Sequence, residues 1–376
     1  MKKVKILHCA DFHFDTPFRE LSGSVAEKRK EDLRETFGRV VNLAKEEGVH
    51  IMLLCGDLFD NRMVSPMTIA YLIGKLQEIP GVRVFISPGN HDPYHENSYY
   101  RLVQWPENTH IFKNNMEKVE IEELNTCVYG RGFTQAHQQD SLLHGFSVDD
   151  PTKLNIMTLH GDVVQPGQPS NYNPITPGEI KESRLDYLAL GHRHSVTNIN
   201  KIGDTFWAFC GCPEGRAFDE LGDKGILIGE LRKGDPRIIF KTTGKRKYFE
   251  LKIDISGCKT YEEVGDCIRE KAKDLAPGKN LFKIILQGEM PENFMFLTSV
   301  VKEKLADRFY FLKVEDETCT RVDPESMASD FTLRGLFIKK MQEQIRQTQD
   351  QEERRKTELA LKYGLRILDR GEAGIE

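Results

Sequence analysis

The chain has 376 residues, about two and a half times a typical domain of roughly 150 residues, so two or three domains are expected. With 39% hydrophobic and 30% charged residues it has a globular composition, and its net charge of −5 argues against a non-specific nucleic-acid coat, which needs a large positive excess. No run approaches the roughly 20 apolar residues that span a bilayer, and polar motifs begin by His8, leaving no room for a signal peptide, so we expect a cytoplasmic protein without membrane contact.

Five short apolar runs in the first half of the chain predict buried strands. They cover residues 4–7, 51–54, 82–86, 154–159 and 185–190. Each is bounded by Gly, Pro or polar residues, as buried strands are. Apolar residues recur at helical spacing between the first three runs, at positions 33, 37, 40, 41 and 44 and at 69, 72, 73 and 76. Strands that alternate with helices predict an α/β domain with a buried, partly parallel sheet.

The composition changes after about residue 230. Residues 231–252 hold eight Lys or Arg against two acids and contain turn signals, which predicts a hairpin or linker that closes the first domain. Alternating apolar segments and two helical patterns, at 260–275 and 294–307, then predict a small α+β domain. Beyond Pro324 the pattern is helical to the end of the chain.

Polar side chains follow each of the five predicted strands. In chain order these are Asp11, His13, Asp57, Asn90, His91, His160, His192 and His194. Because ligands of open α/β sheets gather outside the carboxyl ends of the strands, we expect these residues to converge in one crevice. A single histidine is more often structural than a ligand. Five clusters in order, each at a strand end, are far harder to explain by chance.

The donor set favours a pair of transition-metal ions. Leaving out His91, seven imidazole, carboxylate and amide donors remain, and no thiolate joins them. Such sets suit Mn, Fe or Zn rather than Mg or Ca. Seven donors are too many for one four-coordinate ion but suit two ions that share a bridging carboxylate. A centre of this kind attracts phosphate.

The motifs together resemble those of a known family. D-x-H, G-D-x-x-D, G-N-H-D, H-G-D and G-H-x-H, between residues 8 and 194, resemble the calcineurin-like metallophosphoesterases. ADFHFDTPF at 10–18 and GDLFDN at 56–61 resemble the SbcD-type DNA double-strand-break repair nucleases. The resemblance implies an α/β fold, the calcineurin-like α/β/β/α sandwich, with a small α+β capping domain and a C-terminal helical tail. The implied organisation is a catalytic domain over 1–240, a capping, DNA-binding domain over 241–325, and helices for a partner ATPase over 326–376.

The resemblance also implies a role for each site residue. The first metal ion would be held by Asp11, His13, Asp57 and His194. The second would share Asp57 and be held also by Asn90, His160 and His192. The ions would be Mn²⁺, with Fe or Zn as alternatives. His91 would protonate the leaving oxygen rather than bind metal, and Asp60 would orient His91 or, alternatively, only cap a turn.

Two positions depart from parts of the family. Asp60 stands where purple acid phosphatases place a Tyr ligand and archaeal and eukaryotic repair nucleases a His. Cys210 and Cys212 lie where many relatives carry a Pro-Gly-Ser-type loop. This pair could also form a metal or redox site, whereas other cysteines in apolar runs are expected to be reduced core residues.

The rest of the chain offers candidate surfaces for DNA and for partners. Basic residues that could follow a DNA backbone, or simply form a solvated hairpin, are Arg237, Lys241, Lys245, Arg246 and Lys247. An apolar stripe that fits groove binding to an SbcC-like SMC-type ATPase, or packing on the capping domain, comprises Leu333, Leu336, Phe337 and Met341. The resemblance also implies a homodimer, for which the helix at 64–79 is a candidate surface.

We therefore predict a dinuclear metal-dependent DNA exo- or endonuclease. The alternative within the same chemistry is a phosphodiesterase or phosphatase that acts on small nucleotides or phosphoproteins. A non-catalytic scaffold with this fold is a third hypothesis, which the presence of all seven ligands and His91 disfavours.

Overall fold

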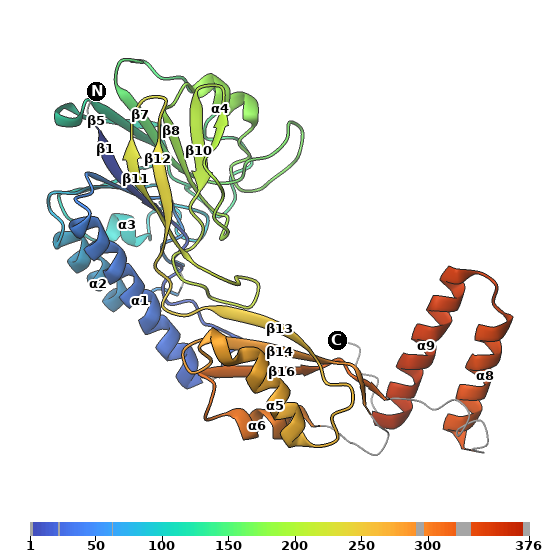
Figure 1. Ribbon diagram of the computed structural model, residues 1–376. Helices are drawn as coiled ribbons and strands as arrows, with labels where there is room; N and C mark the ends of the chain where they lie inside the picture. The colour runs from blue at the N-terminus through green and yellow to red at the C-terminus, as the bar shows by residue number, and fades with distance from the viewer. Residues whose placement is uncertain (1–2, 22, 62, 291–296, 321–331, 371–376) are drawn as a thin grey trace. The chain divides into compact units, whose positions relative to one another are not determined.

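The computed structural model describes the chain except for residues 1–2, 22, 62, 291–296, 321–331 and 371–376 (Figure 1). It divides into two compact units, residues 1–247 and 248–376. The predicted boundary at 240/241 lies close to this division, while the predicted boundary at 325/326 lies outside the described residues. Within the described parts of the chain, no helix combines the length and apolar character that crossing a membrane requires.

The first unit contains two six-stranded sheets. The first sheet has the order β12-β11-β1-β2-β3-β4. Its strands are β1 (Val4–Cys9), β2 (Ile51–Leu54), β3 (Arg83–Ile86), β4 (Thr109–Ile111), β11 (Gly225–Leu231) and β12 (Arg237–Thr242). Strands β1 to β4 are parallel, and β11 pairs antiparallel with β1. The carboxyl ends of β1, β2 and β3 therefore lie at one edge of the sheet.

Helices cover one face of this sheet. Helix α1 (Gly23–Glu46) buries its predicted apolar positions and packs with α2 (Pro66–Gln77) and the four-residue α3 (Tyr99–Leu102) (Figure 1). Side chains of β1 alternate, so Leu7 and Cys9 face these helices while Val4 and Ile6 face the second sheet. Since both faces are buried, the strand is an almost continuous apolar run, which is why the sequence revealed it.

The second sheet has the order β5-β6-β7-β8-β10-β9. Its elements are β5 (Glu117–Ile121), η1 (Glu122–Leu124), β6 (Thr126–Gly130), β7 (Leu154–His160), β8 (Tyr187–Gly191), β9 (Asn200–Ile202) and β10 (Thr205–Phe209). Its outer face packs against α4 (Pro177–Ser183). The layers are thus helix, sheet, sheet, helix, and the predicted α/β/β/α metallophosphoesterase fold is confirmed. All five predicted strands are present, divided between the two sheets.

The second unit has a three-stranded parallel sheet with helices packed against it. The sheet consists of β13 (Tyr248–Asp254), β14 (Leu281–Gln287) and β16 (Phe311–Asp316). The other elements are α5 (Tyr261–Ala272), η2 (Lys273–Leu275), β15 (Glu289–Met290), α6 (Thr298–Leu305), β17 (Cys319–Thr320), α8 (Leu333–Gln347) and α9 (Gln351–Arg370). The helices predicted at 260–275 and 294–307 correspond to α5 with η2 and to α6.

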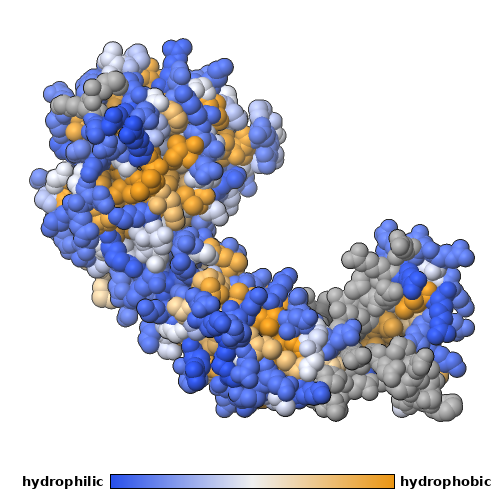
Figure 2. Space-filling view, in the orientation of Figure 1, coloured by the Kyte–Doolittle hydropathy of each residue, from blue (hydrophilic) through white to orange (hydrophobic). Residues whose placement is uncertain are grey.

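The helical pair α8–α9 uses only part of the predicted apolar stripe. Leu333 and Leu336 are exposed, and Met341 is half-buried. Phe337 instead packs against α9, where Gly364 leaves room for its ring: a Cβ on Gly364 would lie 2.2 Å from it. Most of the visible face of each unit is hydrophilic, with apolar side chains in patches between the polar ones (Figure 2).

Candidate metal centre

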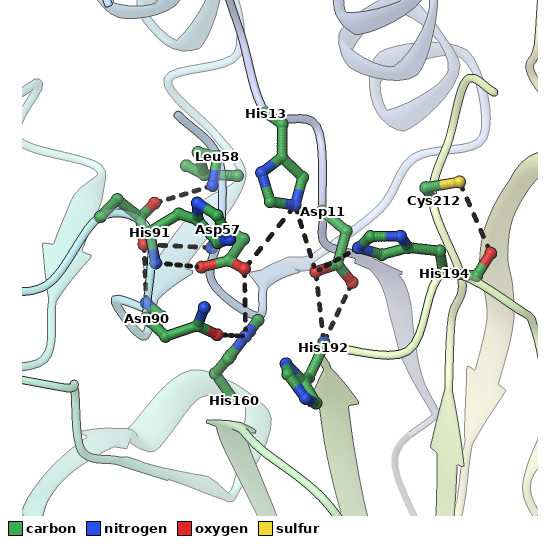
Figure 3. Close-up of polar contacts among 12 residues, drawn as sticks. Asp11, His13, Asp57, Leu58, Asn90, His91, His160, His192, His194 and Cys212 are labelled. Atoms are coloured by element: carbon green, nitrogen blue, oxygen red, sulfur yellow. Dashed lines mark hydrogen bonds and ion pairs between the residues drawn. The ribbon is translucent and has the colours of Figure 1, made fainter. Parts of the chain in front are cut away.

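The eight residues predicted to converge at strand ends lie together beyond the carboxyl ends of strands from both sheets (Figure 3). Asp11 and His13 follow β1, Asp57 follows β2, and Asn90 and His91 follow β3. In the second sheet, His160 ends β7, and His192 and His194 follow β8. The parallel pairing of these strands within each sheet brings residues so distant in sequence to one place.

Two groups made up only of predicted ligands have the spacing of metal ligands. The ligand atoms of each group lie within 4.8 Å of one another, and the groups are Asp11 with His13 and His194, and Asp57 with His160 and His192. Oδ2 of Asp57 lies 3.3 Å from Nε2 of His160 and 3.6 Å from Nε2 of His13, so this carboxylate faces both groups. Metal bonds of about 2.0–2.2 Å place the ligands of one ion roughly 3–4 Å apart.

An unsatisfied buried nitrogen supports the fit of metal ions to this site. Nε2 of His13 is buried and, among the described residues, has no hydrogen-bond partner, although it points toward Asp11 and Asp57 (Figure 3). The two carboxylates are also buried, with 0% and 2% of their surface exposed. Buried groups of this kind are costly unless a cation or hydrogen bonds compensate them. A divalent ion between His13 and the carboxylates would satisfy all three.

The carboxylates and imidazoles are oriented by the neighbouring motifs. The backbone N–H of His192 donates to Oδ2 of Asp11 at 3.0 Å, and that of His91 donates to Oδ1 of Asp57 at 2.9 Å. Nδ1 of His160 lies 2.8 Å from the carbonyl oxygen of Cys55, which leaves Nε2 directed at the centre. A second partner of this kind fixes the ring orientation of metal-binding histidines.

The backbone is strained where the candidate ligands sit. Asp11, His13, Asp57 and His192 have positive φ angles, of 56°, 47°, 52° and 105°. Residues other than glycine rarely adopt such angles, and strain of this type concentrates at functional sites. Gly89 allows a close approach of two motif loops, since a Cβ there would lie 2.3 Å from Oδ1 of Asp57.

The electrostatics of the buried groups indicate a site built for cations. Although burial lowers it, the charge of Asp57 raises the pKa of His160 to about 9. Burial raises the pKa of Asp11 to about 6, against the opposing charges of His160 and His194. In the absence of metal, protons on these groups would therefore compensate part of the buried negative charge.

His91 lies at the entrance rather than among the buried ligands. Its side chain is 45% exposed, and Nδ1 lies 3.6 Å from Oδ2 of Asp60. Both residues line a cavity of about 260 Å³ together with His13 and His194. This placement is compatible with the predicted roles of a proton donor and its orienting carboxylate. His91 also shares a third possible ligand group with His13 and Asp57.

Sequence reasoning missed a buried carboxylate that joins two motif loops. Asp92 is fully buried and accepts hydrogen bonds from the backbone N–H groups of Asp57, Leu58 and Gly89, and from the hydroxyl of Tyr100. It thus fixes the loop after β2 to the loop after β3. Its place in the G-N-H-D motif was the only sequence signal.

A second missed pair lies in the loop between β10 and β11. Glu220 accepts a hydrogen bond from Nδ1 of His194 at 2.8 Å and another from Nη2 of Arg216 at 2.7 Å. Although burial raises it, the bond from His194 and the charge of Arg216 hold the pKa of Glu220 well below its usual range. The possible signal was the i,i+4 spacing of opposite charges just after the Cys-Gly-Cys loop.

The cysteine pair does not join the metal groups. Cys210 and Cys212 are buried, and none of the candidate ligand groups among the described residues contains a cysteine. Burial raises the pKa of both thiols well above the usual range. Since the thiolate is the metal ligand and nucleophile, this environment disfavours a metal or redox role.

The five basic residues predicted to follow DNA are all ion-paired within the first unit. Arg237 pairs with Asp235, Lys241 with Glu47, Lys245 with Asp32 and Glu35, Arg246 with Asp32, and Lys247 with Asp223. Their charge is therefore largely balanced by neighbouring acids. Their contact with DNA stays a prediction.

Comparison with known proteins gives a consistent family match. The model of the calcineurin-like phosphoesterase family matches residues 4–196. The chain is 25% identical to the uncharacterized metallophosphoesterase YhaO of Bacillus subtilis (strain 168), over 97% of this chain and 99% of that protein. It is 24% identical to the DNA double-strand break repair protein Mre11 of Saccharolobus solfataricus, over 85% of this chain and 84% of that one. The solved structure of TT1561 from Thermus thermophilus aligns at 12% identity and a TM-score of 0.41, over 64% of this chain and all of its own.

Proposed function

The chain belongs to the calcineurin-like phosphoesterase family, and we propose that it is a metal-dependent nuclease that hydrolyses phosphodiester bonds in DNA. The observation that carries this proposal is the pair of ligand groups facing Asp57, with His91 exposed beside them in one cavity. Such an arrangement suits the hydrolysis of a phosphate ester whose leaving oxygen needs a proton.

Each residue of the site has a separate role in the proposed hydrolysis. Two divalent ions held by the seven donors would supply a water-derived nucleophile at neutral pH and absorb charge on the phosphate; Mn²⁺ is our proposal for their identity. His91 donates a proton to the departing sugar oxygen from the exposed side of the cavity. Asp60 holds the imidazole in the orientation that this transfer needs. Asp92 keeps the loops that bear Asp57 and His91 in register.

DNA is proposed as the substrate because of the extent of one similarity. The likeness to the repair protein Mre11 spans 85% of this chain, so it extends past the family match at 4–196 and into the second unit. A second unit can offer additional binding surface to a polymeric substrate. We propose that it acts as a capping, DNA-binding domain.

The alternative substrate is a small nucleotide or a phosphoprotein. This alternative is favoured because the five basic residues between 237 and 247 are all ion-paired with acids, so their charge is not available as a continuous basic surface for DNA. The cavity of about 260 Å³ is also small. The two substrate classes can be separated by turnover.

The test uses the full chain with Mn²⁺ and end-labelled single- and double-stranded DNA, beside bis-p-nitrophenyl phosphate. We expect cleavage of DNA, lost in His91→Ala and kept in the control His144→Ala, whose side chain is 85% exposed elsewhere on the first unit. Rapid turnover of the small diester without DNA cleavage would establish the alternative. Bound metal without any turnover would favour a scaffold.

The C-terminal helices are proposed as the site for an SbcC-like SMC-type ATPase. Leu333 and Leu336 expose 73% and 57% of their surface on α8, as anchors for a groove would. Deletion of 326–376 should leave cleavage of short substrates intact and abolish association with the ATPase.

A homodimer through α2 is proposed on the resemblance, and Met67 there is 75% exposed. Sedimentation of Met67→Glu against wild type tests it.

A further inference from the structure

We propose that Arg216, held by Glu220, is a substrate-phosphate-binding residue at the side of the candidate metal centre, where its guanidinium takes a non-bridging oxygen of the phosphodiester. The inference rests on the proposed function and adds to it a contact that chooses anionic substrates.

Arg216 lies at the side of the candidate metal centre. It lines the same cavity of about 260 Å³ as His91 and Asp60. Its Nη2 lies 2.9 Å from Nδ1 and 3.2 Å from Nε2 of His194, so the guanidinium lies against the ring of a candidate ligand. A phosphate in this cavity would therefore lie beside the guanidinium of Arg216 as well as beside the candidate ligands.

Glu220 explains why a cation is tolerated beside a site for two divalent ions. Its carboxylate accepts hydrogen bonds from Nη2 and from the backbone N–H of Arg216, both at 2.7 Å, while it also accepts from Nδ1 of His194. Only 14% of the Arg216 side chain and 7% of that of Glu220 are exposed. One acid therefore offsets the charge of the arginine and fixes its direction, so little entropy is lost when it binds substrate.

The chemistry of the guanidinium then selects the ligand. Arginine offers a planar fork of N–H donors that matches phosphate oxygens, and charge-assisted bonds of this type are about twice as strong as neutral ones. The cavity is smaller than the roughly 300–1,000 Å³ typical of ligand pockets. It therefore suits a phosphate with part of its sugar, with the rest of the substrate outside.

The experiment measures binding of thymidine 5′-monophosphate to the Mn²⁺-loaded full chain by titration calorimetry, with thymidine as the probe that lacks the phosphate. The variants are Arg216→Gln, Arg216→Lys and the control Arg83→Gln, which removes a half-exposed arginine at the start of β3, at the opposite end of the strand from the site. Mn²⁺ affinity of each variant is titrated separately.

We expect Arg216→Gln to weaken nucleotide binding about 10- to 100-fold, with Mn²⁺ affinity within about threefold of wild type and weak thymidine binding unchanged. Arg216→Lys should recover part of the loss because it keeps the charge. The KM for bis-p-nitrophenyl phosphate should rise with the nucleotide Kd.

The inference is overturned if Arg216→Gln binds the nucleotide within about twofold of wild type. It is also overturned if Mn²⁺ and nucleotide affinity fall in parallel, which would mean that Arg216 only supports His194. If circular dichroism shows that Arg216→Gln folds poorly, the test uses Arg216→Lys instead. A nucleotide affinity of Arg216→Lys equal to that of wild type would then refute a contact between the planar guanidinium and the phosphate. A chain that cleaves the small diester but not DNA refutes the nuclease proposal alone, because nucleotide binding can still depend on Arg216.

Discussion

Replacement of Asp92 by Asn should destabilise the two loops that carry the candidate ligands. The carboxylate accepts bonds from the N–H groups of Asp57 and Gly89 on Oδ1, at 3.1 and 2.7 Å, and from Leu58 N–H and the Tyr100 hydroxyl on Oδ2, both at 2.7 Å. Burial and the charge of Asp57 raise the pKa of Asp92 to about 6, against the hydrogen bonds from Tyr100 and Gly89. Measurements at pH 8 therefore compare the ionised carboxylate with a neutral amide.

The magnitude follows from the four bonds. An asparagine keeps one oxygen, and its NH₂ group must face two former donors. The Tyr100 hydroxyl can rotate and accept, whereas Leu58 N–H is left unsatisfied, which costs about 1–3 kcal/mol. Two bonds also lose the charge of their acceptor. We expect a loss of about 3–5 kcal/mol for Asp92→Asn, and about 1–2 kcal/mol for the control Tyr100→Phe, which removes one bond.

The assay is urea unfolding at pH 8 combined with amide hydrogen exchange. Exchange of the amides of Asp57, Leu58 and Gly89 should accelerate in Asp92→Asn, and Mn²⁺ affinity should fall. If Asp92→Asn unfolds within about 1 kcal/mol of Tyr100→Phe and the three amides keep their protection, Asp92 does not join the loops in the way we describe.

Three further outcomes are expected. Burial lowers the pKa of His8 to about 3, so between pH 6.5 and 4.5 the imidazole takes up a proton in the unfolded chain but not in the folded one. Over this range the free energy of unfolding of wild type should fall by about 2 kcal/mol more than that of His8→Gln. Equal decreases for the two proteins in urea unfolding would contradict this. Glu220→Gln should weaken Mn²⁺ binding about tenfold, because its charge no longer supports the Nδ1–H of His194; unchanged calorimetric affinity would refute the role. Gly89→Ala should lower thermal stability by about 1–3 kcal/mol and abolish Mn²⁺-dependent turnover, since the methyl group would meet Asp57; a variant with normal turnover would show that the loop can relax.

The strands that carry the candidate ligands were predictable because both of their faces are buried. In β2 all four residues are buried, so the apolar run stands out between polar neighbours. The short strand β5, of sequence EKVEI, is half-exposed and has only two apolar residues, Val119 and Ile121. It escaped detection for that reason. The assignment of strands to two sheets depends on pairings such as β1 with β11, which no local pattern encodes.

The parts of the site that could be predicted are those with local motifs. Asp57 and His160 follow or end apolar strands, so their place at a sheet edge follows from the pattern. The partners that orient them do not follow from it. Glu220 contacts His194 because of the conformation of the loop between β10 and β11, which the sequence pattern does not predict. Asp92 binds backbone N–H groups, which every residue other than proline has, so the sequence does not identify its partners. Sequence thus revealed the donors better than the contacts that position them.

A buried charge network links helix α1 to the loop that bears Arg216 and Glu220. Glu214, two residues before Arg216, is fully buried and accepts bonds from Nη2 of Arg29 at 2.6 Å and from the hydroxyl of Thr36 at 2.9 Å. Movement of the loop away from α1 would leave a buried carboxylate and a buried guanidinium without each other, which costs several kcal/mol. The contacts of Glu214 with Arg29 and Thr36 therefore oppose movement of the loop away from α1. Because a fixed donor spends little energy on reorganisation when charge arrives, the network makes Arg216 a better phosphate ligand than an arginine on a free surface loop.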